Sequence, residues 1–197
     1  MVRGNVADLE AGRSPEMDPS VVERARDGDY LAYEELARAT ADRLYPVAWR
    51  ILRDRDLADD AVQKTLVAIW RELPKLREAA AFDSWSYRIV VRFCTQELRS
   101  QHPYDKDIYE LDMGSKPTEG TTMVARRDEL ARGFQRLSAE HRAVVVLVYY
   151  EGLTINEAAA VLDVAPGTVA SRLHYAMRTL RAALEADARP GFPMGEK

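Results

Sequence analysis

A short stretch near the C-terminal end of this sequence constrains the fold more than any other. Thr154 and Glu157 fit a capping box, in which the threonine oxygen and the glutamate carboxylate satisfy backbone amides left free at a helix start. A short helix over 155–162 is therefore predicted. The next three residues form a tight connection, and Pro166 suits the first turn of a second, longer helix. A short helix, a three-residue turn and a long helix indicate a helix-turn-helix.

The second helix of this motif, predicted over 166–180, is the one expected to enter the major groove of DNA. Its exposed first turns would reach phosphates and base edges. The residues predicted to face DNA are Pro166, Gly167, Thr168, Ala170, Ser171, Arg172, Tyr175 and Arg178. Those expected on the inward face are Val169, Leu173, Ala176 and Leu180. The alternative is an ordinary helical hairpin whose arginines are merely solvated.

The composition indicates a globular protein whose DNA contacts are local. Hydrophobic residues make up 47% of 197 residues, and the formal net charge is -4, which argues against a chain coated with cations. No stretch of about 18 apolar residues occurs, and the segment 1–17 is polar. We therefore expect a cytoplasmic protein with a disordered start and no membrane insertion.

Cysteine and histidine usage gives no sign of a metal or redox site. The single cysteine, Cys94, excludes an intramolecular disulfide and is expected in the core. The histidines His102, His141 and His174 are scattered and do not form a metal-ligand set with it. No catalytic constellation stands out, so we predict neither cofactor, nor metal, nor enzymatic activity.

The first half of the chain is predicted to form four helices, and the second half four more. The helices of the first half cover 18–28, 30–52, 57–73 and 81–99. Asp18 with Pro19 begins the first helix and Asp56 is the predicted cap of the third. The apolar stripe of the third helix is Ala61, Val62, Leu66, Ile69 and Trp70. In the second half, further helices are predicted over 122–136 and, capped by Ser138 and closed by Gly152, up to residue 150.

Between the two halves the helical pattern stops, at 101–120. This segment holds prolines, glycines and five acids against two lysines, so it is predicted to be a linker. The predicted organisation is a disordered segment 1–17, a helical domain 18–100, the linker 101–120, a helix-turn-helix domain 121–187 and a disordered tail 188–197.

Taken as a whole, the array from about residue 27 to 184 resembles the extracytoplasmic-function (ECF) sigma factors of bacterial RNA polymerase. The strings Leu-Ser-Ala-Glu-His-Arg at 137–142, Glu-Gly-Leu-Thr at 151–154 and Pro-Gly-Thr-Val-Ala-Ser-Arg-Leu at 166–173 resemble their region 4. That region recognises the promoter -35 element. The resemblance implies an all-α fold of two small helical domains, sigma region 2 and the region 4 helix-turn-helix, joined by a flexible acidic linker.

The string Asp-Asp-Ala-Val-Gln-Lys-Thr-Leu at 59–66, with a tryptophan beyond it, resembles region 2.2 of the family. The resemblance implies docking on the coiled coil of the polymerase β′ subunit, and region 4 implies contact with the β flap. The core-polymerase candidates are Asp59, Asp60, Gln63 and Leu66. The alternative is a solvated helix face.

The string Phe-Asp-Ser-Trp-Ser-Tyr-Arg-Ile at 82–89 resembles the segment that recognises and melts the -10 element. Exposed aromatics there would stack on unpaired bases while arginines neutralise the backbone. The candidates are Trp85, Tyr87, Arg88 and Arg92. Trp85 and Phe93 lie on the apolar stripe and are better placed for the core, which leaves Tyr87, Arg88 and Arg92 as the favoured DNA contacts.

Several residues depart from the family pattern. Lys64 replaces a usual glutamate, Arg92 a usual asparagine and Gln96 a common aspartate, and Ala170 and Tyr175 stand where lysine or arginine is common. For each phosphate that such a residue fails to neutralise, the salt slope of DNA binding falls by about 0.9. Weak DNA affinity or an unusual promoter is the expected consequence.

The leading hypothesis is a sigma factor that brings core polymerase to -35 and -10 elements, under the control of an anti-sigma factor that the resemblance implies. A sigma-like decoy that sequesters an anti-sigma factor is one alternative, motivated by the missing cations. A stand-alone helix-turn-helix regulator is another, and it leaves the first domain unexplained.

Overall fold

The computed structural model describes residues 16–101, 132–134 and 136–187. Every regular element in these ranges is helical, which confirms the predicted all-α fold. The elements are α2 (Pro19–Arg26), α3 (Tyr30–Leu52), α4 (Arg55–Glu72), η1 (Leu73–Lys75), η2 (Ala79–Ala81), α5 (Phe82–Gln101), α7 (Ala139–Val145), η3 (Val146–Tyr150), α8 (Ile155–Leu162) and α9 (Pro166–Asp187). The predicted linker, most of the helix over 122–136, the tail and residues 1–15 lie outside the described ranges.

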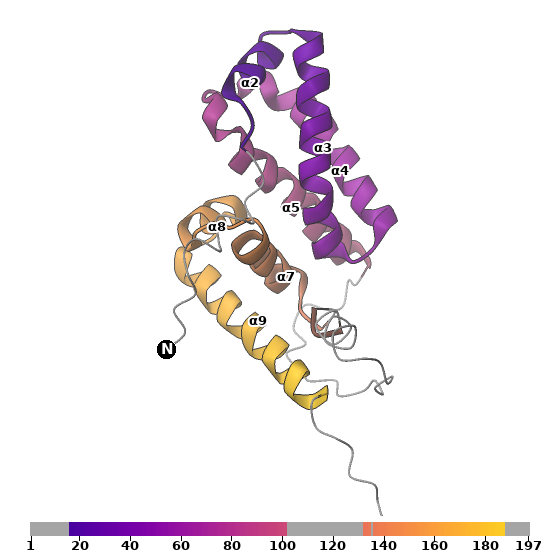
Figure 1. Cartoon of the computed structure of the whole chain (residues 1–197), viewed down its shortest axis with the longest axis vertical. Coiled ribbons are helices and arrows are strands. Elements are labelled where there is room, and N and C mark those ends of the chain that lie inside the picture. Colours follow the sequence, from indigo (N-terminus) through magenta and orange to yellow (C-terminus); the bar gives the residue numbers. More distant parts are fainter. Residues whose placement is uncertain (1–15, 102–131, 135, 188–197) are drawn as a thin grey trace, which may run out of the picture.

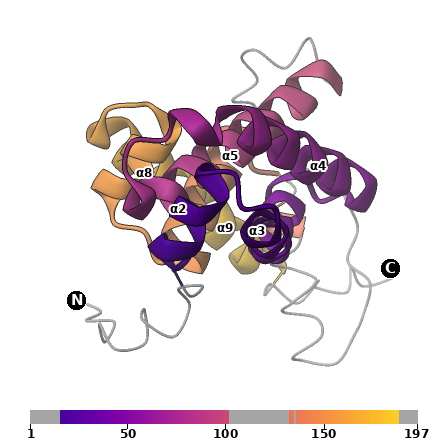
Figure 2. The ribbon, with the colours of Figure 1, turned by 90° about the horizontal axis from the view of Figure 1, so that it is seen from above.

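The helices form two modules stacked along the long axis of the molecule (Figure 1). We call α2–α5 the first module and α7–α9 the second. The helix α5 lies where the two modules meet, and Figure 2, viewed from above, shows α8 and α4 on opposite sides of it. Since α5 packs against α3 and α4 as well as α7 and α8, it is covered from both modules.

Side-chain caps fix where the helices begin. Ser138 caps α7 as predicted, its hydroxyl accepting the backbone N–H of His141 at 3.3 Å. The prediction of Asp56 as the cap of α4 is wrong. Asp54 has the extended backbone that a cap requires, and its carboxylate accepts the N–H of Leu57 at 3.0 Å, while Asp56 lies in the first turn. Two aspartates precede the same apolar stripe, and the sequence pattern does not separate them.

The predicted helix ending at residue 150 is not one regular α-helix. It changes at Val146 from α7 into the π-helical turn η3, and the N–H of Glu151 donates to the carbonyl of Val146, five residues back, at 3.1 Å. Gly152 follows with φ 67°, which confirms the predicted glycine cap. As a result, Glu151 is only 4% exposed although Tyr149 and Tyr150 beside it are exposed.

Buried apolar side chains form two clusters. One lies within the first module and contains Leu36, Ile69 and Phe82. The other begins in the first module, around Val90, and continues into the second module around Val144, without interruption. The two modules therefore share a continuous core and pack together in this structure.

Cys94 belongs to this shared core, as predicted, and is fully buried. Burial raises the pKa of its thiol to about 12. The thiolate is the reactive species, so we expect Cys94 of the folded chain to resist a disulfide reagent at pH 8 and to react at once in denaturant. Absorbance of the released chromophore measures this, and rapid reaction without denaturant would contradict the burial described.

Candidate nucleic-acid and polymerase interface

The helix-turn-helix is held by local hydrogen bonds. Thr154 Oγ1 accepts the N–H of Glu157 at 3.2 Å, and the Glu157 carboxylate accepts the N–H of Thr154 at 2.8 Å, so the predicted capping box is formed. Asp163 then takes a left-handed conformation with φ 54°, and the N–H of Val164 donates back to the carbonyl of Ala159 at 3.1 Å. These bonds fix the direction in which α9 leaves the turn at Pro166.

The first turns of α9 present the predicted DNA-facing residues on an accessible surface. Pro166, Gly167, Ala170, Ser171, Tyr175 and Arg178 are exposed, and Thr168 and Arg172 are partly exposed. Val169 and Ala176 are fully buried, and Leu180 is buried, as predicted for the inward face. Arg178 stacks over the ring of Tyr175, 5.7 Å from its centroid, so the tyrosine carries a cation beside it.

Arg172 lies close to His141 of α7. Burial lowers the pKa of His141, and the neighbouring Arg172 lowers it further, against the opposing effect of Glu140. The imidazole therefore adds little positive charge near the start of α9 at neutral pH. Arg172 is the main cation of the first turns.

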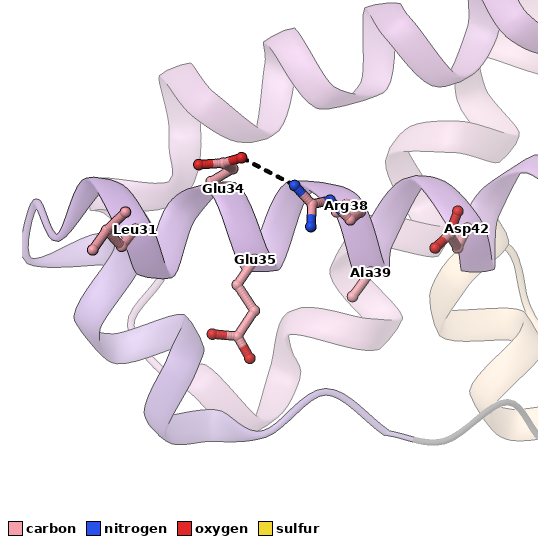
Figure 3. Close-up of a pocket in the computed structure, with 6 residues that line it drawn as sticks. All are labelled: Leu31, Glu34, Glu35, Arg38, Ala39 and Asp42. Carbon is pink, nitrogen blue, oxygen red and sulfur yellow. Dashed lines mark hydrogen bonds and ion pairs between the residues drawn. The ribbon is translucent and has the colours of Figure 1, made fainter.

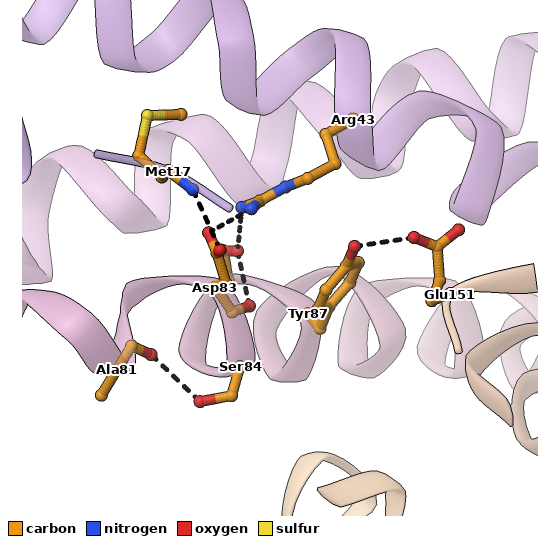
Figure 4. A network of polar contacts seen from close by, with 8 residues as sticks. Met17, Arg43, Ala81, Asp83, Ser84, Tyr87 and Glu151 are labelled. Atoms are coloured by element: carbon orange, nitrogen blue, oxygen red, sulfur yellow. Dashed lines mark hydrogen bonds and ion pairs between the residues drawn. The ribbon is translucent and has the colours of Figure 1, made fainter. Parts of the chain in front are cut away.

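On α5, the predicted DNA contacts divide into two groups. Arg88 and Arg92 are exposed, and Trp85 is partly buried against the cluster of the first module, 5.9 Å from the ring of Phe82. The expectation that Tyr87 faces DNA does not hold in this arrangement, because Tyr87 is only 6% exposed. Its hydroxyl donates to Glu151 of the second module at 2.7 Å, and both side chains are buried (Figure 4).

A polar network beside this bond also escaped the sequence reasoning. Arg43 of α3 pairs with Asp83 of α5 and donates to Ser86 Oγ at 3.0 Å, and Asp83 accepts the N–H of Met17 at 3.1 Å (Figure 4). Met17 closes the segment predicted to be disordered and is instead fixed here. Because the partners are 40 to 66 residues apart in sequence, no local pattern signals the network.

The predicted core-polymerase residues share the outer face of α4. Asp59, Asp60 and Gln63 are exposed, and Leu66 is partly buried. Lys64, on the same helix, forms an ion pair with Glu97 of α5, which neutralises its charge. The acidic character of the face is thereby kept.

Trp70 was predicted in the apolar stripe of α4, and that prediction is wrong. Trp70 is 56% exposed and makes an edge contact with Tyr33 at 4.4 Å between ring centroids. Val67, one turn before it, is also exposed. The outer face of α4 therefore ends in an accessible apolar patch that continues the face of Asp59, Asp60 and Gln63.

One hollow on the surface of the described residues lies away from the residues discussed above. It measures about 410 Å³ and runs along one face of α3 between Leu31 and Asp42, where Arg38 pairs with Glu34 (Figure 3). Its lining comes from a single helix. Among the described residues no group of three or more His, Cys, Asp or Glu side chains could hold a metal ion. No helix in the same ranges has the length and apolar character needed to cross a bilayer.

Comparison with known families assigns both modules. Residues 36–103 match the family model of Sigma-70 region 2, and residues 133–182 match that of Sigma-70 region 4. The chain is 33% identical over 165 residues to the ECF RNA polymerase sigma factor SigM of Mycobacterium tuberculosis, covering 82% of this chain and 81% of SigM. The chain belongs to the ECF group of the sigma-70 family.

Other sigma factors support the same assignment. The RNA polymerase sigma-H factor of Pseudomonas aeruginosa is 28% identical over 183 residues, which cover 86% of this ECF chain and 95% of that protein. Among solved structures, CnrH in complex with the cytosolic domain of CnrY matches with a TM-score of 0.64 and 27% identity, over 87% of this chain and 99% of CnrH.

A second solved structure shows the fold alone. It is the sigma factor RpoE in complex with the anti-sigma factor NepR from Bartonella quintana, with a TM-score of 0.59 and 21% identity, over 79% of this chain and 98% of RpoE.

Removal of the capping box should weaken the region 4 module measurably. Thr154→Ala deletes the oxygen that accepts the N–H of Glu157, and we expect it to lower the free energy of unfolding by about 1 kcal/mol. Thr154→Ser keeps the hydroxyl and should stay within a few tenths of the wild-type value. Urea denaturation followed by circular dichroism measures both, and equal losses for the two variants would show that the cap does not contribute.

Proposed function

We propose that this chain is a promoter-specificity subunit of bacterial RNA polymerase. It directs the core enzyme to paired -35 and -10 elements, helps to open the duplex and performs no bond chemistry itself. The observation that carries the proposal is the accessible start of α9, held by the capped α8 and the turn, in a chain that matches sigma region 4 beside region 2.

We assign the -35 element to the first turns of α9. Arg172 and Ser171 read base edges, and the backbone amides around Gly167 and Thr168 bind a phosphate at the helix N-terminus. The set is completed by Pro166, Ala170, Tyr175 and Arg178. The stacked Arg178 places a guanidinium over Tyr175, which offsets the lack of a cation at that position.

The opened -10 strand is assigned to α5. Arg88 and Arg92 are exposed for phosphate contacts, and Trp85 and Tyr87 supply rings for stacking. Tyr87 belongs to this set only when the second module is away from α5, because the two are in contact here.

We assign the binding of core polymerase to the outer face of α4. Asp59, Asp60, Gln63 and Leu66 contact the β′ coiled coil, and the exposed Val67 and Trp70 extend this surface. The region 4 module contacts the β flap. A further partner is expected because CnrH, at 27% identity, was solved in complex with the cytosolic domain of CnrY, and we assign this role to an anti-sigma factor.

Run-off transcription tests the proposal. With purified bacterial core polymerase and promoters selected from a randomised -35 and -10 library, we expect transcripts from the wild-type chain and strong loss with Arg172→Ala, since a base contact contributes about 1–3 kcal/mol. Arg181→Ala, exposed further along the same helix, is the matched control and should retain activity.

The outcome separates the candidate functions. Absence of both polymerase binding and transcripts on all templates would sink the sigma-factor proposal. Specific DNA binding without core association would favour a stand-alone regulator, and tight binding to an anti-sigma factor alone would favour a decoy.

Gly167 provides a test of close approach to the DNA backbone. A Cβ added there meets no atom within 4 Å, so Gly167→Ala leaves the folded chain undisturbed and its melting temperature unchanged or higher. We expect the same variant to weaken binding of the holoenzyme to -35 DNA several-fold, because the methyl group meets the phosphate instead. Unchanged affinity in a fluorescence-anisotropy titration would refute the phosphate contact.

A further inference from the structure

The second module lies on the part of α5 that carries the -10 candidates. The hydroxyl of Tyr87 is taken by Glu151, and the guanidinium of Arg88 donates to the carbonyl of Ala160 in α8 at 2.9 Å. Tyr87 is buried under the second module with its donor engaged, so its ring is closed to a DNA strand, whereas Arg88 stays exposed with one of its donors taken. While the modules are together, Tyr87 cannot stack on an unpaired base.

The bond between Tyr87 and Glu151 is the most buried polar contact between the modules. The two side chains are 6% and 4% exposed, so both are largely removed from solvent. Burial raises the pKa of Tyr87, and the Glu151 carboxylate raises it further, which keeps the phenol a donor. Removal of one partner leaves the other buried without a hydrogen bond, and that costs more than the bond itself contributes.

The contact between the two modules also contains a repulsive interaction between two arginines. Arg53 ends α3 in a left-handed conformation with φ 61°, and Arg142 lies on α7 of the second module. Burial lowers the pKa of Arg142, and the charge of Arg53 lowers it further. Within the described ranges neither arginine has an acidic partner, and Arg142 Nε is buried without a hydrogen bond. Attraction at Glu151 and repulsion at Arg53 thus act across one interface.

We propose that the second module inhibits the chain's own -10 surface, and that Glu151 sets the equilibrium between a closed and an open form. The proposal rests on the proposed function, since it takes α5 as the -10 reader. Binding of the two modules at separate places on core polymerase selects the open form. The affinity of the free chain for single-stranded DNA is reduced by the fraction that is closed.

Single-molecule energy transfer on the full chain tests this without polymerase or DNA. Dyes are attached at Glu35→Cys and Ala182→Cys, which are exposed positions in different modules, and the buried Cys94 stays unlabelled. We expect the wild type to show mainly one population, with the transfer efficiency of the packed modules. Glu151→Ala should raise the open-to-closed ratio about tenfold or more, as expected for removal of a bond to a charged group.

Two further variants bracket the result. Glu151→Gln keeps the size of the side chain and an acceptor oxygen, so its ratio should lie between those of the wild type and Glu151→Ala. Arg53→Asn removes the repulsion at a left-handed position that asparagine tolerates, so it should lower the ratio. An unchanged ratio in Glu151→Ala, with native circular dichroism, would overturn the proposal, as would opening in Arg53→Asn.

A double-mutant cycle covers the case in which Glu151→Ala disturbs the fold. Tyr87→Phe removes the donor of the same bond. The double variant should therefore change the open-to-closed ratio by less than the sum of the two single variants' effects in free energy. Simple additivity would overturn the proposal. The readout concerns the free chain only, so failed transcription would sink the sigma-factor function while leaving this result intact.

Discussion

The structure depends on the burial of one helix, α5, from two directions. Its apolar residues pack against α3 and α4 to complete the first module, and they also meet α7 and α8 of the second. Polar residues on the covered faces of such a helix are cut off from solvent, so they must find partners within the protein. The pairing of Asp83 with Arg43, and of Tyr87 with Glu151, follows from that constraint.

The sequence was sufficient for most of the fold because the signals there are local. Helix periods, the capping box at Thr154, the cap at Ser138 and the glycine at 152 each involve residues within about one turn of each other. The misplaced cap at Asp56 has the same origin, since Asp54 and Asp56 carry the same chemistry two residues apart. Local signals fix the existence of an element better than its boundary.

The candidate site was predictable only where it is local. The exposed and buried faces of α9 follow from helical spacing, and the structure has them as the sequence indicates. The burial of Tyr87 depends on Glu151, which is 64 positions away in the sequence. The exposure of Trp70 depends on how the other helices pack around α4, which the spacing within α4 does not reveal. Helical spacing also gives no sign of the π-helical turn, which alters the hydrogen bonding without altering the apolar pattern.

That turn, η3, has a consequence for how such a chain can change. A π-helical turn holds one residue more than the α-helical turn it interrupts, so deletion of a single residue restores regular α geometry. A deletion within η3 would leave the base-reading face of α9 and the acidic face of α4 chemically unaltered. It would act on the backbone at Glu151, which follows the turn directly and bonds to Tyr87 of α5. Deletion of one codon at this point would therefore change how the two modules are coupled and leave the residues assigned to DNA and polymerase as they are.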